Sequence, residues 1–122
     1  MGKTVLLIED EPNIIEAISF ILSRDGWTVF SHSNGADALD AVARRNPDVV
    51  ILDVMLPGKT GLEVLKDLRE NADTAGLPVL MLTARGQAKD REQAEKMGAS
   101  LYMTKPFSNS EVLEKVKELV AT

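Results

Sequence analysis

Cysteine is absent from the sequence, and histidine occurs only once, as His32. Without cysteine the chain has no disulfide, no thiolate ligand for a metal and no cysteine nucleophile, and the sequence does not constrain its redox compartment. His32 follows a mixed strand that we expect at the edge of the fold, so we interpret it as a surface residue rather than a ligand or general base. We therefore expect oxygen-based chemistry.

Long apolar segments are also missing, since no run approaches the roughly 18 residues that a membrane span requires. Met1-Gly2-Lys3 leads straight into a short strand-like run, which is unlike a secretory signal peptide. We therefore expect a cytoplasmic protein that does not associate with a membrane.

Basic residues are outnumbered, because 14 Lys and Arg residues stand against 19 Asp and Glu residues and give a net charge of -5. They are interleaved with acidic residues, whereas proteins that bind nucleic acid hold the phosphate backbone with clustered Lys and Arg. We expect no direct binding of nucleic acid by this chain. A protein partner or a hard cation fits this charge balance better.

The length of 122 residues predicts a single domain over residues 1–122. A chain of this size buries roughly two thirds of its unfolded surface, which is enough for a stable core. The 44% hydrophobic and 27% charged content is that of an ordinary globular protein.

Short apolar runs alternate with segments whose apolar residues recur at helical spacing. We expect strands at 4–8, 27–31, 49–53, 78–82 and 100–103, and helices at 12–24, 35–45, 61–71, 87–97 and 109–121. Uniformly apolar strands are typical of a parallel sheet covered on both faces. The pattern predicts an α/β fold, a flavodoxin-like three-layer (βα)5 sandwich with a parallel five-stranded sheet in the order 2-1-3-4-5.

Polar residues suited to phosphate chemistry follow or end four of these apolar runs. Glu9 and Asp10 follow the first run, Asp53 ends the third, Thr83 follows the fourth and Lys105 follows the fifth. Because parallel strands end at one edge of a sheet, we expect these five side chains to converge there. Three carboxylates facing one ammonium leave an excess of negative charge, which Mg²⁺ could balance with oxygen ligands.

Asp53 is the natural nucleophile of this group, because a carboxylate at a strand end can attack phosphorus and form an acyl phosphate. Thr83 and Lys105 would then donate hydrogen bonds to the phosphoryl group. The Lys105-Pro106 bond is a candidate cis peptide, which would direct the amine of Lys105 toward the site.

The chain resembles a response-regulator receiver domain of the CheY-like superfamily over essentially its whole length. The resemblance rests on an ordered set of residues: Glu9-Asp10, Asp53-Val54-Met55-Leu56-Pro57, Gly61, Thr83-Ala84, Tyr102 and Lys105-Pro106-Phe107. It implies that Asp53 accepts a phosphoryl group from a histidine kinase or phosphotransfer protein. It also implies a Mg²⁺ site, for which Mn²⁺ could substitute, formed by Asp10, Asp53 and the Met55 carbonyl, with Glu9 assisting through water.

The same resemblance implies that Thr83 and Tyr102 form a switch. The hydroxyl would move toward the phosphoryl group and the aromatic ring would rotate inward, which changes the surface of the last two βα units and controls a downstream protein or output domain. Such a domain is a signalling protein rather than an enzyme, with self-catalysed phosphotransfer and autodephosphorylation. It would be a monomer or a phosphorylation-dependent dimer.

Two alternatives remain open at the sequence level: an interaction module that does not use phosphate, and a Mg²⁺-dependent aspartyl phosphatase. A phosphatase would usually have a second acid two residues after the nucleophile, where this chain has Met55.

The segment 87–97 has few apolar residues, so we expect its helix to be weakly docked and to be the element that moves.

Overall fold

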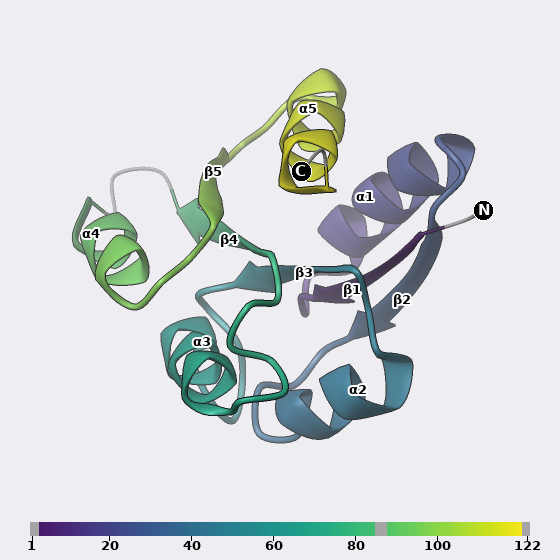
Figure 1. The fold of residues 1–122 in the computed structure, drawn as a ribbon. Helices are drawn as coiled ribbons and strands as arrows, with labels where there is room; N and C mark the ends of the chain where they lie inside the picture. Colours follow the sequence, from purple (N-terminus) through teal and green to yellow (C-terminus); the bar gives the residue numbers. More distant parts are fainter. Residues whose placement is uncertain (1–2, 85–87, 121–122) are drawn as a thin grey trace.

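The computed structural model describes residues 3–84 and 88–120, which form five strands and five helices (Figure 1). The strands are β1 (Thr4–Ile8), β2 (Thr28–His32), β3 (Val49–Asp53), β4 (Val79–Ala84) and β5 (Leu101–Lys105). The helices are α1 (Pro12–Arg24), α2 (Ala38–Arg45), α3 (Gly61–Glu70), α4 (Ala88–Lys96) and α5 (Asn109–Val120). Within these described residues, no helix combines the length and the apolar character that crossing a membrane requires.

The strands form one parallel sheet in the order β2-β1-β3-β4-β5. Helices α1 and α5 cover one face of this sheet, and α2, α3 and α4 cover the other (Figure 1). The predicted flavodoxin-like three-layer (βα)5 sandwich with strand order 2-1-3-4-5 is therefore confirmed.

Alternation along each strand builds a separate core on each face of the sheet. In β1, Leu6 and Ile8 belong to the core beneath α2, α3 and α4, whereas Val5 and Leu7 belong to the core beneath α1 and α5. All four side chains are buried, because helices cover both faces. This explains why the central strands are apolar throughout and polar residues appear only where a strand ends.

The most evident difference from the predicted boundaries is the start of α2, which begins at Ala38 rather than at residue 35. The Gly35 N–H donates to the Pro57 carbonyl (3.0 Å), and the Ala36 N–H donates to the Asn34 side chain (2.7 Å). These two bonds hold residues 35 and 36 in a loop that packs against the chain after β3. The helix therefore begins only at Ala38.

The other boundaries shift by one or two residues. Strand β2 covers 28–32 rather than 27–31, and β4 and β5 continue to Ala84 and Lys105 because their ladder extends past the apolar runs. Helix α3 ends at Glu70. The predicted ends of two helices, Gln87 and Ala121, lie outside the described residues, and among the described ones α4 ends at Lys96.

Two loops at the opposite edge of the sheet from the carboxylates are joined by Arg69, near the end of α3. Its guanidinium donates to the carbonyls of Gly98 (2.8 Å) and Leu77 (2.7 Å), and more weakly to those of Thr74 and Ala75 and to the Ser100 hydroxyl. Burial lowers the pKa of this guanidinium. Arg69 thereby connects α3 to the loop before β4 and to the loop between α4 and β5.

We expect Arg69→Met to lower the free energy of unfolding by about 2–4 kcal/mol, since it removes several hydrogen bonds from a charged donor while keeping the apolar stem. Urea denaturation followed by circular dichroism measures this change. The matched control, Arg44→Met, alters an exposed arginine of α2 and should change stability by no more than about 0.5 kcal/mol. Equal effects of the two substitutions would contradict the role assigned to Arg69.

Candidate functional site

The carboxyl edge of the sheet brings together residues from three strands that are far apart in the sequence. Glu9 follows β1, Asp53 ends β3 and Lys105 ends β5. Carboxylate oxygens of Glu9, Asp10 and Asp53 all lie within 4.8 Å of one another. The predicted convergence of these four side chains is therefore found in the structure.

Glu9 is fully buried, and its two carboxylate oxygens have different surroundings. Oε2 accepts the backbone N–H groups of Asp10 and Glu11, both at 3.0 Å, whereas Oε1 accepts no backbone N–H and faces the Lys105 ammonium. Burial raises the pKa of Glu9 to about 7; the backbone hydrogen bond from Glu11 opposes this rise, and the nearby charge of Asp53 adds to it. Because the buried negative charge is unfavourable on its own, Glu9 is stabilised either by binding a proton or by a cation beside Oε1.

Asp53 is also buried, with 2% of its surface exposed. Its Oδ1 accepts the Met55 N–H (3.3 Å), and its Oδ2 accepts no backbone N–H. Met55, two residues further along the chain, is 68% exposed. Apart from the ammonium of Lys105, Asp53 Oδ2 therefore has no hydrogen-bond donor among the described residues.

Lys105 is the cation that faces these carboxylates. Its Nζ lies 3.1 Å from Asp53 Oδ2, 3.2 Å from Glu9 Oε1 and 3.2 Å from Glu11 Oε1. Burial by itself would lower the pKa of Lys105, but the charges of Asp53 and Glu9 outweigh burial and raise it. The ammonium therefore stays charged, and it cannot neutralise every carboxylate around it. The Lys105-Pro106 bond is cis, as expected.

The acidic cluster fits a divalent cation. Two of its buried oxygens, Glu9 Oε1 and Asp53 Oδ2, have no donor other than the Lys105 ammonium that they share, and Asp10 is exposed at the mouth of the site. Carboxylate oxygens with access for retained water are the donor set that Mg²⁺ prefers. The described residues thus offer a suitable site for a hard divalent ion.

Thr83 and Tyr102, the predicted switch pair, are placed differently from each other. Leu82 pairs with Asp53 in the sheet, so Thr83 lies one residue beyond Asp53 on the neighbouring strand. Its buried hydroxyl donates to the Met103 carbonyl across a long 3.5 Å. Tyr102 is half-buried beneath α4 rather than in the acidic cluster.

Glu11 is the site residue that the sequence reasoning missed, as a second acceptor for Lys105 beside the predicted carboxylates. Its position directly after Glu9-Asp10 was the available signal.

His32 is half-buried, and its Nε2 lies 2.5 Å from Asp37 Oδ1. That contact lowers the pKa of Asp37 and gives His32 a partner outside the acidic cluster.

The loop after Asp53 is held close to the strand end by Gly61, the first residue of α3. The Gly61 N–H donates to the Val54 carbonyl (2.9 Å), and a Cβ on Gly61 would lie 2.0 Å from the Asp53 carbonyl oxygen. Thr60 and Glu63 form a reciprocal capping box at the same helix end, which the sequence analysis did not identify. The backbone beside Asp53 is therefore tightly constrained.

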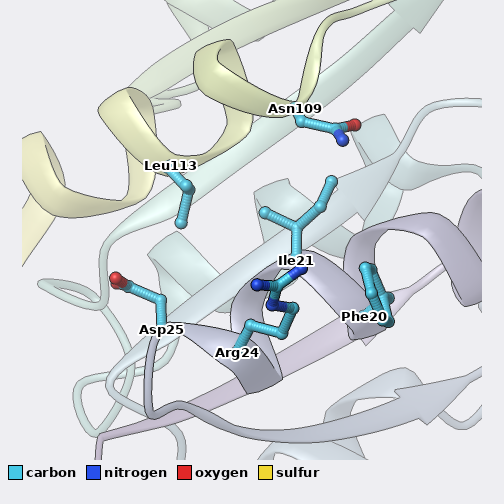
Figure 2. Close-up of a pocket in the computed structure, with 6 residues that line it drawn as sticks. All are labelled: Phe20, Ile21, Arg24, Asp25, Asn109 and Leu113. Carbon is cyan, nitrogen blue, oxygen red and sulfur yellow. The ribbon is translucent and has the colours of Figure 1, made fainter.

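A separate pocket lies between α1 and α5, and Figure 2 shows the side chains that line it. Its lining consists of Phe20, Ile21, Arg24, Asp25, Asn109 and Leu113. None of the carboxylates of the cluster, nor Lys105, lines it. The chemistry of the edge site therefore does not extend into this pocket.

Comparison with known sequences gives a consistent result. The family model described as the response regulator receiver domain matches residues 5–117. The probable transcriptional regulatory protein TcrX of Mycobacterium tuberculosis is 44% identical over 117 residues, which cover 96% of this chain and 49% of that protein. The chain thus spans about half the length of this curated relative.

Solved structures resemble this one along its whole length. A putative response regulator from Chloroflexus aurantiacus is 33% identical with a TM-score of 0.95, and the match covers 100% of both chains. The receiver domain of a sensor histidine kinase from Pseudomonas aeruginosa is 26% identical with a TM-score of 0.91, again over 100% of both chains. The latter structure has a magnesium ion coordinated in its active-site cleft.

We expect Asp53→Asn to raise the free energy of unfolding by about 1 kcal/mol in the presence of EDTA. The change removes repulsion from two carboxylates and the cost of burying a charge, and it loses only one attraction, to Lys105. Urea denaturation at pH 8, where Glu9 is mostly ionised, measures the effect. Asp40→Asn, in an exposed position of α2, is the control that should not gain stability, and a less stable Asp53→Asn would contradict the charge argument.

We expect Gly61→Ala to cost about 1–3 kcal/mol, because the new methyl group must displace backbone next to Asp53. Gly76→Ala is the matched control, since a Cβ at Gly76 would meet nothing within 4 Å. Both substitutions restrict the unfolded chain similarly, so the difference between their urea midpoints isolates the close approach. Equal midpoints would show that the loop after β3 moves to accommodate a methyl group at little cost, which would contradict the tight constraint inferred beside Asp53.

Proposed function

We propose that this chain, which belongs to the family of response regulator receiver domains, accepts a phosphoryl group on Asp53. The observation that carries the proposal is Asp53 Oδ2, a buried carboxylate oxygen that is paired with Lys105 Nζ at 3.1 Å and accepts no other hydrogen bond. We further propose that residues 1–122 form one receiver domain.

In the proposed reaction, Asp53 Oδ2 attacks the phosphorus of a phosphorylated histidine on a kinase or phosphotransfer protein. The new O–P bond forms as the P–N bond breaks, and the imidazole leaves with the electron pair of that bond. Lys105 is already directed at the attacking oxygen and would donate to the transferred phosphoryl group, with Thr83 as a second donor. The hydroxyl of Thr83 gives up only one long contact, to the Met103 carbonyl.

The metal that fits the site is Mg²⁺, and Mn²⁺ would satisfy the same oxygen ligands. Glu9, Asp10, Asp53 and the backbone carbonyl of Met55 would hold it, with Glu9 acting through water. When bound, the ion would neutralise charge on the phosphoryl oxygens. The buried oxygens of Glu9 and Asp53, which share the Lys105 ammonium as their one donor, support this assignment, as does the magnesium ion in the similar Pseudomonas aeruginosa receiver domain.

Thr83 and Tyr102 are proposed to convey phosphorylation to the surface formed by α4, β5 and α5. They lie on adjacent strands, and Thr83 bonds the backbone of the residue that follows Tyr102. A response regulator acts through a downstream protein or output domain. The similarity to TcrX, a probable transcriptional regulatory protein of about twice this length, supports an output step of that kind.

Incubation with acetyl phosphate and Mg²⁺ tests the acceptor role. We expect mass spectrometry to show an adduct of about 80 Da, the mass of a PO₃ group, in the unaltered protein and in Asp40→Asn but not in Asp53→Asn. An adduct that survives in Asp53→Asn would contradict the assignment of Asp53. No adduct in the unaltered protein would favour a phosphate-independent interaction module, and rapid release of phosphate from many phosphomonoesters would favour a phosphatase.

A further inference from the structure

Helix α4 is attached to the rest of the molecule mainly at its C-terminal end. Ala94 is the only buried residue within Ala88–Lys96. Past this end, the Ala99 N–H donates to the Ala94 carbonyl (2.9 Å), and Arg69 donates to the Gly98 carbonyl (2.8 Å). This small burial agrees with the weak docking expected for the segment. A helix that buries so little apolar surface is expected to be displaced at low free energy, so its other contacts matter.

Arg91, one turn before Ala94, provides such a contact with Tyr102. Its Nη2 donates to the Tyr102 hydroxyl, and its guanidinium carbon lies 4.0 Å from the centroid of the Tyr102 ring. The same guanidinium is 3.9 Å from the carboxylate of Glu95. One side chain of α4 thus binds both the polar tip and the aromatic face of a β5 residue.

The position of Tyr102 makes this contact consequential. Its ring is half-buried against the core under α4, while its hydroxyl meets Arg91 at the exposed surface. An inward rotation of the ring would carry the hydroxyl away from that surface. Tyr102 would have to leave the guanidinium before such a rotation could occur.

We propose that Arg91 is a latch that holds Tyr102 at the α4–β5 surface and restrains the switch. This inference rests on the proposed function, in which phosphorylation of Asp53 is coupled to Tyr102. Because the contacts exist only in the latched state, they lower the population of the switched state before phosphorylation. Arg91 is a positioning residue, since it acts through Tyr102 and contributes nothing to phosphoryl transfer itself.

Tyr102 is the only tyrosine in the chain, so incorporation of 3-fluorotyrosine gives a single ¹⁹F NMR signal from this side chain. The full chain would be titrated with beryllium fluoride in the presence of Mg²⁺, as a mimic of the phosphoryl group. In Arg91→Gln we expect the ¹⁹F signal of the free protein to move toward its position in the beryllium fluoride complex. We also expect half-saturation at an about threefold lower beryllium fluoride concentration, since an exposed cation–π contact is modest.

Two variants of the same helix are matched controls. Glu95→Gln removes the other partner of Arg91 but leaves its contacts with Tyr102, and Lys89→Gln removes an exposed positive charge from α4. Both should retain the signal position and the half-saturation of the unaltered protein. If Lys89→Gln reproduced the effect of Arg91→Gln, the effect would be one of net charge and the latch would be wrong.

The remaining outcomes separate the latch from the function on which it rests. An Arg91→Gln signal and half-saturation identical to those of the unaltered protein would overturn the latch alone. Binding of beryllium fluoride without movement of the Tyr102 signal in the unaltered protein would overturn the switch and the latch, and would leave Asp53 as acceptor. Failure of the unaltered protein to bind beryllium fluoride would overturn the proposed function as a whole.

Discussion

One ammonium shared among several carboxylates is the constraint on which the carboxyl edge of this sheet depends. Lys105 lies within 3.2 Å of oxygens from Glu9, Glu11 and Asp53, so it ties the end of β5 to the residues that follow β1 and end β3. The negative charge still exceeds the positive, and two buried oxygens have no donor other than this shared ammonium. This uncompensated buried negative charge lowers the stability of the fold. It leaves a site for a cation and, under the proposed function, for a phosphoryl group that supplies further oxygen ligands.

The backbone beside Asp53 and helix α4 differ in how firmly they are held, and this difference suits a signalling domain. Around Asp53 the backbone is close-packed, with Gly61 against the strand end. Farther along the same face of the sheet, α4 buries only Ala94 within Ala88–Lys96 and depends on polar contacts at its surface. A rigid reaction site preserves the geometry of transfer, while a loosely held helix can change position for a small free energy.

The sequence predicted what depends on local pattern and missed what depends on contact between distant segments. Apolar runs and helical spacing sufficed for the strand order and for the meeting of Glu9, Asp10, Asp53 and Lys105, since parallel strands share an edge. The late start of α2 follows from a bond between Gly35 and Pro57, which no local pattern encodes. The Arg69 contacts to Gly98 and Ser100 are equally invisible, because they join residues 29 and 31 positions apart.

Thr83 and Tyr102 lie between Asp53 and α4, and their contacts indicate which step of the proposed switch would cost the most free energy. Thr83 lies beside Asp53 in the sheet and bonds the Met103 carbonyl at 3.5 Å, near the limit of a hydrogen bond, so turning its hydroxyl toward a phosphoryl oxygen would forfeit little. Tyr102 precedes Met103, and its inward movement would forfeit both contacts with Arg91. The larger cost therefore falls at the α4 end, so the identity of residue 91 would tune the response without altering the residues that receive the phosphoryl group.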